Sequence, residues 1–102
     1  MVIDIDDEEA LRLLSANPPE ILTSRTGGGG YHLWFRCDSP ELTRTFLINS
    51  EGRHIGEVRG DGAYVVVPPS ATPAGAYTWH RRAPIPVTND PQGFVARLLA
   101  QL

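Results

Sequence analysis

The sequence contains no lysine, only one cysteine and no long hydrophobic run, and the last two of these shortages each exclude a class of protein. The single cysteine, Cys37, supports neither a disulfide framework nor a cysteine-rich zinc site. No apolar run approaches the roughly 18 residues of a membrane span, and the acidic start is the opposite of a signal peptide. We therefore expect a soluble, cytoplasmic protein with no membrane partner.

The balance of charge sets a further limit. The 102 residues include nine basic and twelve acidic side chains, a formal net charge of −3, which excludes a protein that binds nucleic acid through bulk positive charge. All nine basic residues are arginine. A high-GC genome accounts for this bias, and so does the suitability of the planar guanidinium for phosphate contacts. The length predicts a single domain over residues 1–102.

Alternation of apolar and polar residues, with Gly and Pro at the boundaries, predicts the order of the elements. We expect, in this order, a strand over 2–6, a helix that ends before Pro18-Pro19, strands over 20–26 and 31–36, a hairpin of 55–59 and 63–67, a short strand over 77–79, and a helix over 94–102 that begins near Asn89 or Asp90. Residues 38–53 are predicted to be irregular apart from 46–48, and residues 68–70 are predicted to leave the sheet. This order indicates an α+β sandwich with helices on one sheet face.

Two carboxylates share one face of the first predicted strand. Asp4 and Asp6 alternate with Ile3 and Ile5, which places the acids about 7 Å apart at their Cα atoms and on the face opposite the isoleucines. Such a pair repels itself unless a cation or hydrogen-bond donors lie between the two groups, and Mg²⁺ or Mn²⁺ suits this arrangement. The alternative is an acidic, solvated start of the following helix.

Four consecutive glycines at residues 27–30 precede the strand that carries His32. Glycine allows the backbone to approach an anion closely, so that N–H groups such as those of Gly29 and Gly30 contact a phosphate. A flexible hairpin loop explains the same run, which is neither a Walker loop nor a dinucleotide-binding loop because a strand follows it. His32 lies opposite the apolar stripe of Tyr31 and Leu33, and a structural role explains it when it is considered alone.

Glu57 and Arg59 project from the same side of the strand over 55–59. A structural ion pair explains these two residues. A third carboxylate for the Asp4 and Asp6 metal site, with a phosphate-binding arginine beside it, explains them equally well. The residue types therefore leave both interpretations open.

Arginine is also the candidate contact for DNA in this acidic chain. The candidates outside the strand over 55–59 are Arg25, Arg36, Arg44, Arg53, Arg81 and Arg82. The pair at 81–82 directly follows Trp79-His80, and this combination of charge and aromatic rings is typical of single-strand binding. A loose surface pair explains it as well, and the sequence does not place these arginines on one surface.

The order of these segments resembles the catalytic core of bifunctional DNA primase-polymerases, which belong to the archaeo-eukaryotic primase superfamily. The resemblance rests on Asp-x-Asp at 4–6, Gly-Gly-x-His at 29–32, the segment EVRGDGAYVVVPPS at 57–70, and Gly-x-Tyr-x-Trp at 75–79. It spans residues 2 to about 79, and the segment at 57–70 is its most specific part. It implies the RRM-like catalytic half of such primases, an antiparallel or mixed sheet with helices packed on one face.

The resemblance also implies a role for each site residue. Asp4 and Asp6 match the first metal-binding motif, and Glu57 matches the carboxylate of the third motif, where aspartate is commoner. His32 matches the histidine of the second motif, which is expected near the phosphates of the incoming nucleotide. Arg59 is implied as a further nucleotide contact.

The implied activity is the two-metal addition of nucleotides to a 3′-hydroxyl on a DNA template, with two Mg²⁺ or Mn²⁺ ions as cofactors. The implied partners are a DNA template and primer, nucleoside triphosphates, and a replicative helicase domain. Relatives carry a substantial segment before the first acidic motif, so the resemblance implies an N-terminally truncated module. It is a fragment, a minimal variant, or a protein completed by another chain. Gly30 stands where some relatives carry serine.

Two other functions remain open at this point. A non-catalytic nucleotide- or nucleic-acid-binding module derived from such a primase is compatible with a shortened chain. A nuclease is the second, because three carboxylates also suit two-metal hydrolysis.

Overall fold

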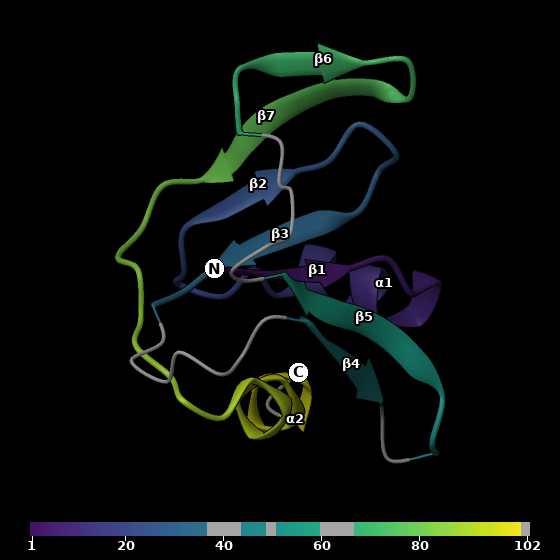
Figure 1. Ribbon diagram of the computed structural model, residues 1–102, viewed down its shortest axis with the longest axis vertical. Helices are drawn as coiled ribbons and strands as arrows, with labels where there is room; N and C mark the ends of the chain where they lie inside the picture. The colour runs from purple at the N-terminus through teal and green to yellow at the C-terminus, as the bar shows by residue number, and fades with distance from the viewer. Residues whose placement is uncertain (37–43, 49–50, 60–66, 101–102) are drawn as a thin grey trace.

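The structure, a computed structural model, describes residues 1–36, 44–48, 51–59 and 67–100. Its described part contains β1 (Val2–Ile5), α1 (Glu8–Ala16), β2 (Thr23–Arg25), β3 (Tyr31–Trp34), β4 (Arg44–Ile48), β5 (His54–Arg59), β6 (Ser70–Thr72), β7 (Gly75–Arg81) and α2 (Pro91–Ala100). The seven strands form an antiparallel sheet in the order β4-β5-β1-β3-β2-β7-β6 (Figure 1). Neither helix of this part is long and apolar enough to cross a membrane.

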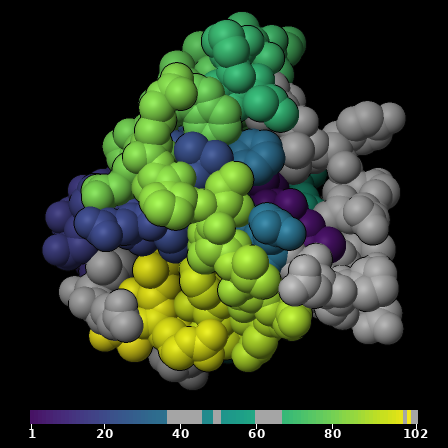
Figure 2. Space-filling view, turned by 90° about the vertical axis from the view of Figure 1, so that its left-hand side faces the viewer, coloured from purple at the N-terminus to yellow at the C-terminus, as the bar shows by residue number. Residues whose placement is uncertain are grey.

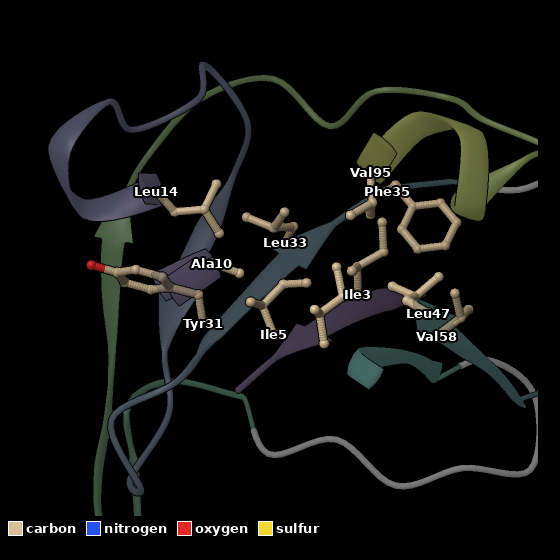
Figure 3. Packing of buried hydrophobic residues seen from close by; sticks show 11 residues of the cluster. Ile3, Ile5, Ala10, Leu14, Tyr31, Leu33, Phe35, Leu47, Val58 and Val95 are labelled. Atoms are coloured by element: carbon tan, nitrogen blue, oxygen red, sulfur yellow. The ribbon is translucent and has the colours of Figure 1, made fainter. Parts of the chain in front are cut away.

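The hydrophobic core lies between one face of this sheet and both helices. Ile3, Leu33 and Val58 project from β1, β3 and β5 and pack with Leu14 of α1 and Val95 of α2 (Figure 3). All five side chains are at most 2% exposed, and burial of each contributes about 1.5–3 kcal/mol. Both helices therefore cover the same face, as the sequence predicts for an α+β fold, and the residues that alternate with the core point to the opposite face.

Local interactions of particular residues explain where the helices begin and where α1 ends. The carboxylate of Asp7 accepts a hydrogen bond from the N–H of Ala10 at 3.0 Å and caps α1. The helix ends at Ala16, shortly before the two prolines at 18–19, which cannot donate backbone hydrogen bonds. Pro91 opens α2, where its missing N–H would have no partner within the helix.

Several predicted boundaries were wrong because pairing between strands decides them. β2 occupies only three residues of the predicted strand over 20–26. Residues 44–45, predicted to be irregular, belong to β4 through their pairing with β5. Ser70, predicted to leave the sheet, begins β6. The predicted hairpin keeps its first arm as β5, whereas its turn and all but the last residue of its second arm lie outside the described residues.

Gly56 permits the close approach of β5 to β1 in the centre of the sheet. It pairs with Ile5, and a Cβ atom at this position would overlap the carbonyl oxygen of Asp4. The obstacle is backbone in a paired strand, which has little freedom to move. A side chain at residue 56 would therefore separate the two strands that carry Asp4 and Glu57.

We predict that Gly56→Ala lowers the free energy of unfolding by about 2–3 kcal/mol, because the methyl group overpacks the β1–β5 contact. Denaturant unfolding followed by circular dichroism measures the change. Gly28→Ala is the matched control: no atom lies within 4 Å of the added methyl group, and we expect a change within about 0.5 kcal/mol. Equal stability of the two variants would contradict the packing argument.

Candidate active site

Three polar side chains lie side by side on the sheet face opposite the helices. Asp4 in β1 is the register partner of His32 in β3 and also of Glu57 in β5. Direct cross-strand neighbours have Cβ atoms about 4.5–5.5 Å apart, so the three groups can interact. Asp4 alternates with Ile3 and Ile5, which belong to the core. The same alternation that buries the isoleucines therefore directs Asp4 to the opposite face.

Arg59 contacts both carboxylates. Its Nε lies 3.3 Å from Oδ2 of Asp4, and its Nη2 lies 2.6 Å from Oε1 of Glu57. On the other side of Asp4, Nε2 of His32 lies 3.5 Å from Oδ1. The side chains of Asp4 and Glu57 are only 19% and 10% exposed, so the guanidinium compensates charges that are largely withdrawn from water. We call Asp4, His32, Glu57 and Arg59 the polar row.

The polar row holds Asp4 in its ionised form. Burial raises the pKa of Asp4, but the hydrogen bonds and charges of His32 and Arg59 outweigh burial and bring the pKa below its ordinary value of 3.8. The structural ion pair between Glu57 and Arg59, one of the two interpretations of the sequence, is present. The two carboxylates of the row therefore share one positive partner, the guanidinium of Arg59.

Asp6 lies beyond the end of β1. The strand ends at Ile5, and the N–H groups of Asp6 and Asp7 both donate to the carbonyl oxygen of Ile55, at 3.4 and 3.3 Å. Among the described residues, no three or more His, Cys, Asp or Glu side chains are grouped so that they could hold a metal ion. The structure thus brings together Asp4 and Glu57, and the assignment of Asp6 as a third metal ligand stays a prediction.

The glycine run forms a tight turn between β2 and β3. The N–H of Gly29 donates to the carbonyl oxygen of Thr26 at 3.0 Å, and the N–H of Gly30 donates to Oγ1 of Thr26 at 2.9 Å. Gly29 has a φ of 93°, and a Cβ atom on Gly30 would lie 2.7 Å from the carbonyl oxygen of Ile5. These contacts explain on structural grounds alone why glycine occupies both positions. Their predicted contact with a nucleotide phosphate stays a prediction.

Aromatic side chains extend this face beyond His32, and of these the sequence analysis considered only Trp79, as the neighbour of Arg81 and Arg82 in single-strand binding. Ser24 in β2 is the register partner of both His32 and Trp79, and its Oγ accepts a hydrogen bond from Nε1 of Trp34 at 3.0 Å. The Trp34 and Trp79 ring centroids are 5.8 Å apart, and the Tyr77 ring lies 6.2 Å from that of His32. Alternation alone groups Tyr77 with Trp79. It does not reveal that β7 pairs with β2.

We predict that Arg59→Ala raises the pKa of Asp4, because it removes a guanidinium that favours the carboxylate. An NMR titration of the Asp4 carboxyl carbon in buffer containing a chelator measures this pKa. Asp4 has a lowered pKa in the folded protein, so its stabilising contribution is present above pH 3.8 and is lost as the pH falls through the folded pKa. In the variant, this loss begins at a higher pH.

Arg12→Ala is the control for this titration. Arg12 is an exposed arginine of α1, and removing it changes the net charge by the same amount without touching the polar row. An Asp4 pKa that moves equally in both variants would show that long-range charge, and not the contact with Arg59, sets it.

One of three comparisons with known proteins identifies a family for this chain. A family model described as "Bifunctional DNA primase/polymerase, N-terminal" matches residues 1–92, nearly the whole chain. The match includes the polar row and all strands of the described sheet. No curated protein and no solved structure matches the chain. The chain therefore belongs to the bifunctional DNA primase/polymerase N-terminal family.

Proposed function

We propose that this chain is a metal-dependent nucleotidyltransferase that adds nucleotides to a 3′-hydroxyl on a DNA template. The observation that carries the proposal is the cross-strand placement of Asp4 and Glu57, two largely buried carboxylates that share one cationic partner. Family membership implies DNA and nucleotides as substrates. The site supports the same class of reaction, because displacement at a phosphate needs concentrated negative charge to hold cations.

The donor set suits Mg²⁺ or Mn²⁺, which prefer oxygen ligands and take part of their coordination from water and substrate phosphates. Asp4 and Glu57 would hold the ions, with Asp6 as the third carboxylate at the end of β1. The guanidinium of Arg59 between the two carboxylates supports this fit, since it shows that a positive charge is favoured there. When bound, a pair of such ions stabilises the attacking and leaving oxygens of the displacement.

His32 and Arg59 are the proposed contacts to the nucleotide phosphates. Nδ1 of His32 is buried, and within the described part of the chain it has no hydrogen-bond partner. A buried polar atom of this kind costs about 1–3 kcal/mol, which a phosphate oxygen would recover. Arg59 is 32% exposed at its side chain and sits at the end of β5, so that it can contact a phosphate while it remains beside Glu57.

The arrangement of the elements supports the RRM-like catalytic half that the resemblance implies. The site residues lie on central strands of an antiparallel sheet, and both helices cover the other face. Rigid strands position catalytic groups more accurately than loops do, and positioning supplies much of the rate in this class of reaction. A replicative helicase domain as partner stays a prediction.

We predict that Asp4→Asn and Glu57→Gln each reduce Mn²⁺-dependent primer extension by roughly 100-fold or more, since each removes charge that holds the cations. Primer extension on a single-stranded template, resolved on a gel, measures the activity. Circular dichroism shows that the variants remain folded, because both substitutions keep the size of the side chain.

Glu8→Gln is the matched control, an exposed carboxylate of α1 outside the polar row, and it retains full extension. Extension at the wild-type rate by either polar-row variant would contradict the proposal. Calorimetric binding of a nucleoside triphosphate by the wild-type chain without any product would favour a non-catalytic binding module. Cleavage of DNA in the absence of nucleotides would favour a nuclease.

A further inference from the structure

The two tryptophans of this protein form one aromatic pair beside the polar row. The chain contains only Trp34 and Trp79, and their ring centroids are 5.8 Å apart with 51° between the ring planes. Ser24, fully buried between the strands, fixes the Trp34 indole through the hydrogen bond to its Oγ. Both indoles are partly exposed. A tilted pair at this distance leaves no room for a base between the rings, so a base would stack on an outer ring face.

Charge is unevenly distributed between the two ends of the sheet. Because the strands are antiparallel, β3, β5 and β7 end at the same sheet end at which β1 begins. Figure 2 shows this end, where the purple N-terminus, the blue end of β3 and the green segment after β7 lie together at the surface. Arginines of the described part gather there: Arg36, Arg59, Arg81 and Arg82.

The opposite end of the sheet is acidic. The run of acids at 6–9 follows β1 there. Arg53, at the same end, is engaged by this run, with its Nε 3.0 Å from Oδ1 of Asp7 and its Nη2 2.9 Å from Oε2 of Glu9. Among the described residues of the arginine-rich end, Arg59 is paired with Asp4 and Glu57. Arg81 lies 3.6 Å from Glu20, whose side chain is 88% exposed, and such an exposed pair is weak. Within the described part of the chain, this acidic protein thus presents a group of arginines at one end of its sheet.

The aromatic pair is continuous with the polar row. Asp4, His32, Ser24 and Trp79 are successive register partners across four neighbouring strands. Trp79 therefore lies two strand spacings, about 10 Å, from His32 on the same face. Tyr77 lies two residues before Trp79 on β7, with its ring 6.2 Å from that of His32. A chain of stacked bases on the tryptophans is close enough to continue into the site.

We propose that the Trp34–Trp79 pair, flanked by Arg36, Arg81 and Arg82, is a stacking surface for the unpaired bases of single-stranded DNA that leads the strand to the polar row. The part of this proposal in which the strand leads to the polar row rests on the proposed function. The rings supply base stacking that tolerates any sequence, and the arginines supply the phosphate contacts, which is how single-stranded nucleic acid is commonly bound. Charge complementarity favours a strand of phosphates over a neutral or basic partner at this end.

Intrinsic fluorescence tests the proposal directly, because every tryptophan of the chain belongs to the surface. The wild-type protein is titrated with an oligothymidylate of about 12 nucleotides in buffer with a chelator, and we expect saturable quenching.

Trp79→Ala lowers the affinity about tenfold, measured by anisotropy of a labelled oligonucleotide, and Trp79→Phe restores most of it. Arg81→Gln and Arg82→Gln each make the slope of log K against log salt concentration less steep by about 0.7.

His80→Ala is the matched control. His80 is the neighbour of Trp79 on β7 but its ring lies 4.8 Å from that of Tyr31, on the helix-covered face, and we expect unchanged DNA affinity. No quenching by the oligonucleotide, equal affinity for thymidine triphosphate and the oligonucleotide, or an equal loss in His80→Ala would each overturn the proposal. Asp4→Asn keeps the quenching. Quenching without extension by the wild-type chain would therefore contradict the proposed function alone, and extension without quenching would contradict the stacking surface alone.

Discussion

The register of β1 between β3 and β5 is the constraint on which both the core and the site depend. In this register Asp4 faces His32 on one side and Glu57 on the other, while Ile3 and Ile5 face the helices. A slip of one residue would exchange the two faces, burying a carboxylate in the core and removing two isoleucines from it. The hydrophobic effect therefore fixes the position of the polar groups. Gly56 contributes by letting the backbones of β1 and β5 approach each other.

Burial of two carboxylates on neighbouring strands requires a positive partner, and Arg59 is that partner. Arginine suits the position because its planar fork reaches both acids and keeps its charge at any ordinary pH. In the proposed function, divalent ions share this role, and the guanidinium contacts the nucleotide phosphates while it remains beside Glu57. The same sheet face then carries two kinds of chemistry, with cations held at its centre and bases stacked on the tryptophans beside it.

Much of this arrangement could be predicted from the sequence wherever local alternation decides. The alternation in residues 2–5 and 31–35 identified the core face and the outward direction of Asp4 and His32, and both helices were predicted close to their positions. Pairing between distant strands could not be predicted. For this reason the contact of Trp79 with Trp34, the strand character of residues 44–45 and the return of the chain to the sheet at Ser70 were missed. The contacts of Arg59 with both acids likewise depend on a register that no local pattern contains.

Mn²⁺ titration followed by NMR tests the central claim, that the polar row is the cation site of this protein. Paramagnetic broadening falls steeply with distance from the ion, so the amide signals that disappear first identify its position. The account predicts that the first losses occur at Asp4, His32 and Glu57 on three adjacent strands, and that Asp4→Asn reduces them. Losses centred instead on the acidic first turn of α1, at Asp7, Glu8 and Glu9, and unaffected by Asp4→Asn would contradict it.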